Sequence, residues 1–305
     1  MNNISGALNL NKPRGCSSHD MVYFARRLFG VKRVGHTGTL DPIATGVLPI
    51  LVGPATKLSE ILSDRDKSYT ATLRLGIETD TMDITGDIIG SAKNMMPLHG
   101  LDEVREAAKA FLGEIEQVPP VYSAIKVKGK KLYEYAREGI EIKPEPRRVT
   151  IHELSCESAA TPGDYILNIS CSKGVYIRSI CRDIGEKLGC GGTMAALART
   201  RSGNFDIAGA YTVEDLERHR ENPAPLLISC EEILGGITDK KIYIDGFYTR
   251  LAKNGAEIYL HKIKAERSVG VGEKVLMYDD AGVFFALGEV REYAGGPACK
   301  PVILL

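Results

Sequence analysis

Residues 35–52 read GHTGTLDPIATGVLPILV, a glycine-rich loop that runs directly into an apolar stretch. The glycines let the backbone take positive φ angles or approach another chain closely. Pro42 favours an extended conformation at Asp41, because a proline ring clashes with a helical backbone at the residue before it. The apolar residues 47–52 predict a buried strand, which would anchor the loop in the core.

The role of Asp41 is open from this stretch alone. A carboxylate on a rigid loop is a candidate nucleophile or general base. An aspartate in a turn also commonly caps a nearby backbone amide. Other parts of the sequence have to decide between the catalytic and the structural interpretation.

Secondary-structure signals lie on both sides of the loop. Ser17 or Ser18 can cap a helix that runs to Phe29 and ends at Gly30. Alternating polar and apolar residues at 67–75 predict a strand, and the polar residues 78–90 predict a loop or a short hairpin. Further strands are predicted at 4–10, 31–34, 121–127, 148–156 and 165–171, and further helices at 101–112, 131–138 and 176–188.

These elements follow one another without a regular strand–helix repeat. They predict an α+β fold with a mixed, largely antiparallel sheet flanked by helices. After residue 239 we find only short strand-like runs, such as 274–277 and 283–287 on either side of a turn. We therefore expect a main domain at 1–238 and a small β-barrel domain at 239–305.

Charge is distributed unevenly although the net charge is zero. Residues 12–36, 126–148 and 171–201 carry +5, +4 and +4, which leaves −13 for the remainder. Segregated charge can form a positive face that binds a phosphate backbone. The alternative is three separate solvated surfaces with no shared partner.

The sequence indicates a protein of a reducing compartment. Its first residues lack the charged start and apolar run of a signal peptide, and no apolar run approaches the roughly 18–20 residues that span a bilayer. The seven cysteines are odd in number and include no Cys-x-x-Cys pair, which excludes a complete intrachain disulfide framework and argues against a zinc site. We expect a cytoplasmic protein with free thiols.

Common catalytic motifs are absent from the sequence: it has no Walker loop, no dinucleotide fingerprint, no Gly-x-Ser-x-Gly and no His-Glu-x-x-His. Residues 35–49 instead resemble the signature of the bacterial tRNA pseudouridine-55 synthases, the TruB family. Further stretches resemble that family's motifs in the same order, namely NLNKPRGCSS at 9–18, GPATK at 53–57, KSYTATLRLG at 67–76, PPVYSAIK at 119–126, GKKLYEYAR at 129–137 and CSKGVYIR at 171–178.

The resemblance covers roughly residues 4–204 and implies a pseudouridine synthase fold with a small C-terminal PUA-like barrel. In the C-terminal part it rests on Asn254-Gly255 and on length. At matching positions, Asp41 corresponds to the catalytic aspartate, and Tyr69 to a tyrosine that stacks on the target base and can assist proton removal. Arg178 corresponds to the arginine that pairs with the catalytic carboxylate.

The resemblance also implies substrate-binding residues. His36 matches a histidine that occupies the space vacated by the flipped nucleotide, and Leu197 matches an apolar residue near the target base. Lys12 and Tyr176, from the first and last motifs, are expected to contact substrate as well. One departure is Ala198, which precedes Arg199 where relatives often have two basic residues, so a backbone contact there stays open.

The implied reaction converts uridine 55 in the T-loop of tRNA to pseudouridine. Uracil leaves ribose C1′, turns over and rejoins it through C5, after the base has been flipped into a pocket. Asp41 could attack covalently or remove the ribose C2′ proton, and the sequence does not choose between these routes. Because no electrons or groups enter or leave, we expect no cofactor and no metal. We also expect a monomer whose partner is the T-arm.

Other functions stay open at this point. The chain could bind and remodel RNA without chemistry, although binding alone does not require a buried carboxylate facing RNA. It could also act on another RNA, or with a guide RNA and protein partners. The series of motifs makes an unrelated small-molecule enzyme remote. Whether residues 78–100 become ordered only on RNA binding is a further open question.

Overall fold

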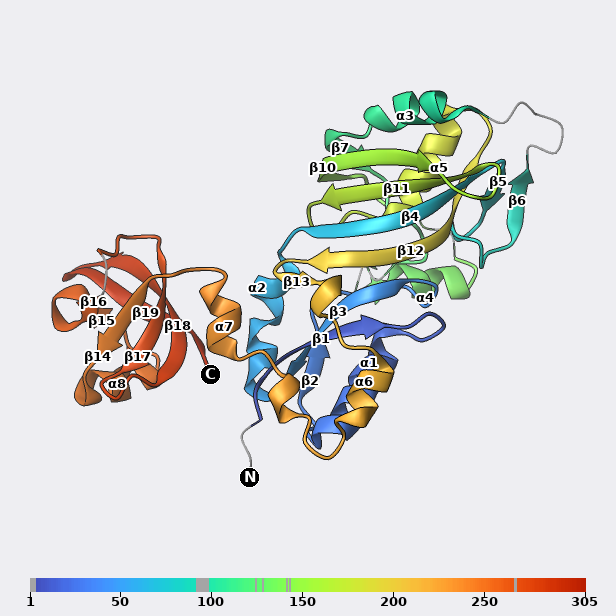
Figure 1. The fold of residues 1–305 in the computed structure, drawn as a ribbon. Helices are drawn as coiled ribbons and strands as arrows, with labels where there is room; N and C mark the ends of the chain where they lie inside the picture. Colours follow the sequence, from blue (N-terminus) through green and yellow to red (C-terminus); the bar gives the residue numbers. More distant parts are fainter. Residues whose placement is uncertain are drawn as a thin grey trace.

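The computed structural model describes residues 4–91, 99–123, 125–127, 129–140, 142, 144–265 and 268–305. Two sheets of unequal size dominate this part of the chain, each with helices packed against it (Figure 1). The strands of the larger sheet are β1 (Gly6–Lys12), β2 (Val34–His36), β3 (Thr45–Val52), β4 (Lys67–Leu75), β7 (Gly113–Gln117), β10 (Arg147–Ser158), β11 (Asp164–Cys171), β12 (Gly192–Ser202) and β13 (Phe205–Asp206).

The larger sheet is mixed and largely antiparallel, as predicted. Its main path runs β1-β3-β12-β4-β11-β10-β7, with β2 beside β3 and β13 beside β12. Among the described pairings of this sheet, only β3 with β12 is parallel. This pairing brings the strand that follows the Asp41 loop against a strand about 150 positions later, a contact that the sequence did not reveal.

One hydrophobic core lies between the sheet and three helices: α1 (Ser18–Phe29), α3 (Leu101–Lys109) and α5 (Ile177–Lys187). The helix α1 begins and ends where the sequence predicted. Ser17 forms a capping box with Asp20, and Gly30 ends the helix with a left-handed φ of 64°. The helices α3 and α5 begin at or within one residue of the predicted positions.

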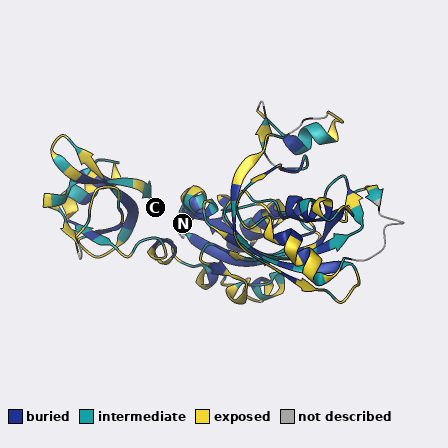
Figure 2. Cartoon of the chain, turned by 90° about the horizontal axis from the view of Figure 1, so that it is seen from above, coloured by how far each residue is buried: buried dark blue, intermediate teal, exposed yellow. Residues whose placement is uncertain are grey.

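Residues 47–52 of the strand β3 are all apolar, and both faces of the strand are buried along this stretch. Leu48 and Ile50 face the core with α1, whereas Val47 and Leu51 belong to a second cluster. That second cluster includes Leu276, and it therefore joins the two sheets through apolar packing. Figure 2 shows this buried interior in dark blue.

The smaller sheet has the strand order β15-β19-β18-β17-β14-β16 and curls into a half-barrel, seen at the left of Figure 2. Its strands are β14 (Lys241–Ile244), β15 (Ile258–Tyr259), β16 (Lys264–Ala265), β17 (Lys274–Asp279), β18 (Phe284–Tyr293) and β19 (Gly296–Leu304). The expectation that only strands follow residue 239 was wrong. The helix α8 (Gly246–Lys253) begins there at an Asp245 cap and buries Thr249 and Ala252.

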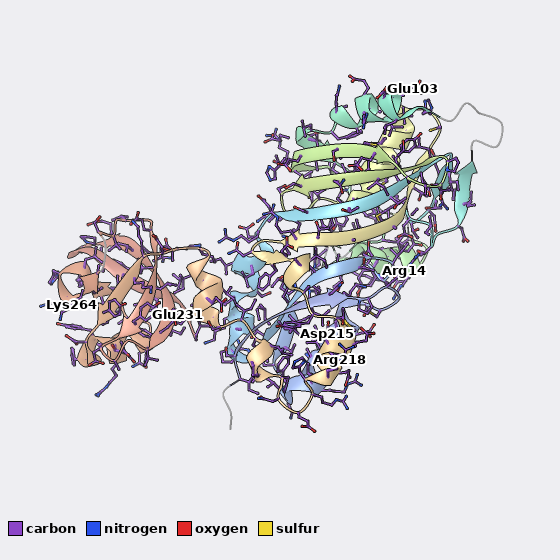
Figure 3. The ribbon with its side chains drawn as sticks, viewed as in Figure 1. Arg14, Glu103, Asp215, Arg218, Glu231 and Lys264 are labelled. Carbon is purple, nitrogen blue, oxygen red and sulfur yellow. The ribbon has the colours of Figure 1, made fainter. Side chains whose placement is uncertain are left out.

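The remaining elements lie in the connections between strands of the two sheets. They are the helices α2 (Ser59–Ser63), α4 (Leu132–Arg137), α6 (Val213–Arg218) and α7 (Cys230–Gly235), with the hairpins β5 (Ile77–Thr79)–β6 (Ile88–Ser91) and β8 (Lys126–Val127)–β9 (Lys130–Lys131), and the short 3-10 turns 53–58, 207–209, 224–226 and 260–262. The helix α7 lies at the join between the sheets, where its Glu231, labelled in Figure 3, accepts a 2.8 Å hydrogen bond from the Tyr278 hydroxyl.

Two further predictions meet different outcomes. The hairpin predicted within 78–90 is present as β5–β6. The strand predicted at 121–127 was wrong, since residues 121–123 form a bend and only Lys126–Val127 pair; Ala124 lies outside the described residues. Residues 92–98, and positions 128, 141 and 143 of the basic segment 126–148, also lie outside them. No helix in the described ranges is long and apolar enough to cross a membrane.

Candidate active site

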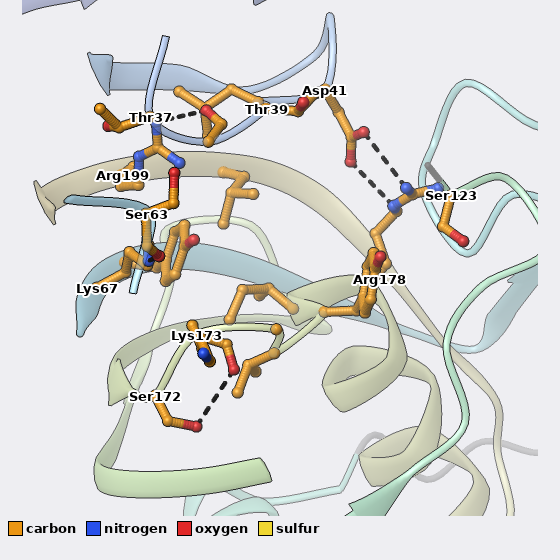
Figure 4. Close-up of a pocket in the computed structure, with 18 of the residues that line it drawn as sticks. Thr37, Thr39, Asp41, Ser63, Lys67, Ser123, Ser172, Lys173, Arg178 and Arg199 are labelled. Atoms are coloured by element: carbon orange, nitrogen blue, oxygen red, sulfur yellow. Dashed lines mark hydrogen bonds and ion pairs between the residues drawn. The ribbon is translucent and has the colours of Figure 1, made fainter. Parts of the chain in front are cut away.

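A cavity of about 420 Å³ opens where the Asp41 loop meets β4, β12 and the start of α5 (Figure 4). Asp41, Tyr69, Tyr176, Arg178 and Leu197 all line it. Five of the seven site residues expected from the sequence therefore meet in one place, although up to 156 positions separate them along the chain. The volume falls in the range of ligand pockets, about 300–1,000 Å³.

Asp41 and Arg178 form the central ion pair of the cavity. Nε of Arg178 lies 3.0 Å from Oδ2 of Asp41, and Nη2 lies 3.3 Å from Oδ1. The arginine side chain is 6% exposed, while the aspartate side chain is 35% exposed. A bidentate contact of this kind fixes the orientation of the carboxylate and leaves it partly open to the cavity.

Arg178 itself is held on several sides. Its Nη1 donates to the carbonyl of Thr81 at 3.1 Å, and its Nη2 donates to the carbonyl of Tyr122 at 2.9 Å. A second buried carboxylate, Asp83, has its Oδ2 3.8 Å from Nη1. Because these contacts use most of its donors, the guanidinium cannot easily leave its position beside Asp41.

Asp83, which lies in the turn of the β5–β6 hairpin, was not among the site residues expected from the sequence. Its Oδ1 accepts hydrogen bonds from the hydroxyl of Thr81 and from both the amide and the hydroxyl of Thr85. The clustering of Thr81, Asp83 and Thr85 in the segment TDTMDITG is typical of a side chain that caps its own turn. That signal predicts a turn, and only the fold brings this turn to Arg178.

The electrostatic environment raises the pKa of Asp41 above the ordinary value of an aspartate. Burial is the main cause, and the nearby charge of Asp83 adds to it. The charges of Arg178 and Lys12 oppose the increase. A carboxylate that is partly desolvated but paired is a stronger base than one in water, while the arginine still favours its ionised form.

Tyr69 and Leu197 supply the apolar surface of the cavity. Tyr69 lies in β4, opposite Ile169 of β11 and Arg199 of β12. Leu197, on β12, is 8% exposed. Burial raises the pKa of the Tyr69 phenol, whereas the charge of Arg199 lowers it. The ring and the leucine side chain together could bind a flat apolar face such as that of a nucleobase.

The other three expected residues differ in their placement. Tyr176 lines the cavity, and its backbone N–H and carbonyl both bond the Gln117 side chain. His36 lies beside the cavity-lining Thr37, and its Nδ1 accepts from the amide of Gly38. Lys12 is fully buried, with its ammonium donating to the carbonyls of Pro13 and Cys16 at 2.9 and 2.8 Å. Its ammonium is thus turned toward its own loop.

The Asp41 loop is anchored at several points along its length. The Ser18 hydroxyl accepts from the amide of Leu40 at 2.8 Å and donates to its carbonyl at 3.1 Å. The amide of Gly15 donates to the carbonyl of Pro42 at 2.8 Å. Sequence analysis considered Ser18 only as a possible helix cap; in the structure it ties the start of α1 to the loop.

No group of three or more His, Cys, Asp or Glu side chains suited to hold a metal ion occurs in the described part of the chain. All seven cysteines are free. Among the described residues, the ionisable side chains that line the cavity are those of one aspartate, four tyrosines and four cations, namely Asp41, Tyr69, Tyr122, Tyr133, Tyr176, Lys67, Lys173, Arg178 and Arg199.

Comparison with solved structures identifies the fold. A Cbf5-Nop10-Gar1 complex contains a chain with a TM-score of 0.72 and 23% identity, covering 99% of this chain and 85% of the other. An H/ACA RNP bound to a substrate RNA containing 2′-deoxyuridine gives a TM-score of 0.71 at 22% identity, covering 98% of this chain and 84% of the other. The fold is shared along nearly the whole chain, including the smaller sheet.

Comparison with curated sequences identifies closer relatives. A tRNA pseudouridine synthase B of Alkaliphilus oremlandii is 44% identical over 288 residues, which is 94% of each chain. One of Caldanaerobacter subterraneus is 41% identical over 93% of this chain and 95% of its own. One of Aromatoleum aromaticum is 47% identical over 83% of this chain and 80% of its own.

Residues 26–177 match the profile of the TruB family pseudouridylate synthase N-terminal domain, and 178–234 match that of the tRNA pseudouridylate synthase B C-terminal domain. Fold and relatives together define a pseudouridine synthase, an RNA-modifying isomerase. The chain belongs to the TruB family.

Proposed function

We propose that this protein converts uridine 55 in the T-loop of tRNA to pseudouridine, with Asp41 as its catalytic residue. The observation that carries the proposal is the ion pair between Asp41 and Arg178 at the wall of a cavity, in a chain of the TruB family. The relatives named tRNA pseudouridine synthase B support tRNA as the substrate.

The target uridine would enter the cavity by flipping out of the RNA. Unstacking costs a few kcal/mol, and the uracil ring would recover part of this by stacking on Tyr69, which contributes on the order of 1–3 kcal/mol in base–aromatic contacts. Leu197 would extend the apolar surface against which the base lies. His36, beside the cavity, would occupy the space that the nucleotide leaves in the RNA.

Asp41 would then act on the ribose. Its ionised carboxylate attacks C1′ or removes the C2′ proton, and either route breaks the bond from C1′ to uracil N1. The released uracil turns over and its C5 bonds to C1′. In the first route the ester bond between Asp41 and C1′ breaks in that step, and in the second route the proton held by Asp41 returns to C2′. The C5 proton leaves last, while N1 takes up a proton, and the Tyr69 hydroxyl would assist the removal from C5. Both routes need an ionised Asp41 in a largely dry cavity, which Arg178 makes favourable.

Further residues would support the Asp41–Arg178 ion pair or the bound nucleotide. Asp83 acts as a positioning residue, because it shares Arg178 with Asp41 and holds the guanidinium from a second side. Tyr176 would contact the bound nucleotide from the turn before α5. Lys12 was expected to contact substrate; its buried ammonium supports a role in shaping the 13–16 loop and in adding positive potential near Asp41.

The RNA would lie against the basic segments 12–36, 126–148 and 171–201, which would together supply positive charge near the cavity opening. Recognition of the folded T-arm by shape and backbone suits such a surface. We take residues 1–238 as the catalytic domain and 239–305 as a PUA-like RNA-binding domain that follows it. We expect the protein to act as a monomer in the cytoplasm.

The decisive experiment uses an unmodified tRNA transcript with tritium at C5 of its uridines. Formation of the C5–C1′ bond must expel that hydrogen, so wild-type protein should release tritium while Asp41→Asn should not, with tRNA binding retained in both. A folded wild-type protein that binds the tRNA but releases no tritium would contradict the proposal. It would favour RNA binding without chemistry instead.

A second set of transcripts tests the site. Replacing uridine 55 by cytidine should abolish release, whereas replacing another T-loop uridine should not. If tritium is still released from the transcript that lacks uridine 55, the protein is a synthase but the assigned target position is wrong.

A further inference from the structure

Arg199 is buried to 1% exposure although it carries a charge, and it is among the largest fully buried side chains of the described residues. It lies on β12 and lines the same cavity as Asp41. Burying a guanidinium is costly unless its donors are satisfied. Its contacts therefore indicate what the fold uses it for.

The Arg199 side chain bridges the two ends of the loop that carries Asp41. Its Nε donates to the carbonyl of Val47 at 2.7 Å, and its Nη2 donates to the carbonyl of Gly38 at 3.2 Å. Gly38 lies three residues before Asp41, and Val47 lies six residues after it. One rigid, planar group thus spans the base of the loop, which a flexible lysine could not do with the same geometry.

The backbone of Arg199 holds the same loop from a second direction. Gly46 is its partner in the parallel pairing of β3 and β12, with a φ of 102° that favours glycine. A Cβ built on Gly46 would lie 2.2 Å from the carbonyl oxygen of Arg199. The end of the loop therefore packs directly against the main chain at this residue, with no room for a side chain.

On its other side Arg199 adjoins the strand that carries Tyr69. The two residues are paired in the antiparallel register of β12 and β4. The guanidinium charge also lowers the pKa of the Tyr69 phenol, against the effect of burial. Figure 4 shows the Arg199 side chain beside Thr37 at the end of the cavity opposite Arg178.

We infer that Arg199 is a positioning residue for the reaction: it fixes the distance between the Asp41 carboxylate and the Tyr69 ring by clamping the Asp41 loop onto β12. The inference rests on the proposed function for its catalytic consequence. The clamp itself is a property of the fold and has its own readout. Two arginines thus position Asp41: Arg178 orients its carboxylate, and Arg199 holds the loop that carries it.

The test compares Arg199→Met, which keeps an unbranched side chain but removes the guanidinium, with Arg199→Lys, which keeps a charge and can reach one of the two carbonyls. Hydrogen exchange by mass spectrometry reports on residues 37–46, where the amides of Thr37 and Ala44 are bonded to Pro49 and Asp41. We expect exchange in this segment to speed up about tenfold or more in Arg199→Met, since two charge-assisted bonds are lost. Arg199→Lys should be intermediate.

Activity on tRNA is measured in the same variants as a single-turnover rate and a Kd. A displacement of the loop by about 1 Å should slow the chemical step by about 100-fold in Arg199→Met, with the Kd for tRNA changed little. Arg201→Met is the matched comparison, because Arg201 lies on the same strand but is exposed and bonds only Ser68 among the described residues. It should weaken tRNA binding without changing exchange in the loop.

Unchanged exchange in residues 37–46 of either folded Arg199 variant would overturn the clamp. So would faster exchange accompanied by an unchanged single-turnover rate, because the loop would then not need fixing. If the wild-type protein forms no pseudouridine, the proposed function fails, and the exchange experiment still decides whether Arg199 holds the loop. Arg199→Lys keeps the test usable if Arg199→Met does not fold.

Discussion

Arg178 lies between two carboxylates, with its Nε 3.0 Å from Oδ2 of Asp41 and its Nη1 3.8 Å from Oδ2 of Asp83. The contact with Asp41 is bidentate, and the Asp41 carboxylate remains partly exposed to the cavity. Asp83 is buried in a hairpin turn. The arginine therefore links the position of the hairpin to that of the Asp41 carboxylate.

Replacing Asp83 by asparagine should slow the reaction by about 10- to 100-fold, because Arg178 loses one of the charges that fix it and a small misplacement of a catalytic group is costly. Binding of tRNA, measured separately by filter retention, should be unaffected. Asp183→Asn is the matched control, since Asp183 pairs with its neighbour Arg182 outside the cavity lining. Wild-type rates in Asp83→Asn would show that Arg178 does not depend on Asp83.

The pH dependence should reveal the raised pKa of Asp41. Only the ionised form is active, so the rate should fall as pH decreases through that pKa, and the fall should begin above the usual range of an aspartate. Removing the like charge in Asp83→Asn should move this acid limb to lower pH, and Arg178→Gln should move it to higher pH. Rates from pH 5 to 8 in the three proteins test the two opposite shifts.

Asp41→Asn should be inactive and yet no less stable than the wild type at neutral pH. Because burial raises the folded-state pKa of Asp41, ionisation weakens folding, and that loss is present above the folded pKa and disappears as pH falls toward the unfolded value. Thermal unfolding at pH 7 and pH 5 measures it. A clear decrease in Tm at pH 7 would mean that the pair with Arg178 stabilises the fold more than burial of the carboxylate costs.

The ring and the hydroxyl of Tyr69 should make separate contributions, the ring to base binding and the hydroxyl to the chemical step. Tyr69→Phe keeps the ring and should bind tRNA normally while slowing the step that needs the hydroxyl. Tyr69→Leu loses the stacking surface, worth on the order of 1–3 kcal/mol, and should also weaken capture of the flipped base. Stopped-flow fluorescence of a tRNA with 2-aminopurine next to position 55 separates base flipping from chemistry. Equal behaviour of the two variants would show that the ring face does not hold the base.

Binding of tRNA should weaken steeply with salt, although the protein has no net charge. If about four phosphates contact the basic segments, a plot of log affinity against log salt should have a slope of about −3 or steeper. Titrations between 50 and 300 mM salt check the value. A slope near zero would show that the clustered positive charges do not face RNA.

Local signals determined much of this protein. Capping and glycine positions defined α1, alternation defined β4 with the bounds that the structure shows, and the motif series placed Asp41, Tyr69 and Arg178 in one family of enzymes. These features depend on residues close together in the chain, where spacing and side-chain type are sufficient. Local signals were not sufficient in two places. Among the described residues of the strand predicted at 121–127, only Lys126–Val127 are paired, and the helix α8 formed where only strands were predicted.

Only the tertiary structure decided what surrounds the Asp41 carboxylate. The sequence predicted only a loop or short hairpin around Asp83, and it marked Arg199 only as a position where relatives often have two basic residues. Their neighbouring sequence carries no information on contacts with residues that lie 42 to 158 positions away. Both acquire their contacts from sheet topology: the parallel pairing of β3 with β12 brings Arg199 under the Asp41 loop, and the β5–β6 hairpin brings Asp83 to Arg178. Burial then strengthens the electrostatic interactions of these side chains. The degree of desolvation depends on how distant segments pack together, so no single segment of the sequence predicts it.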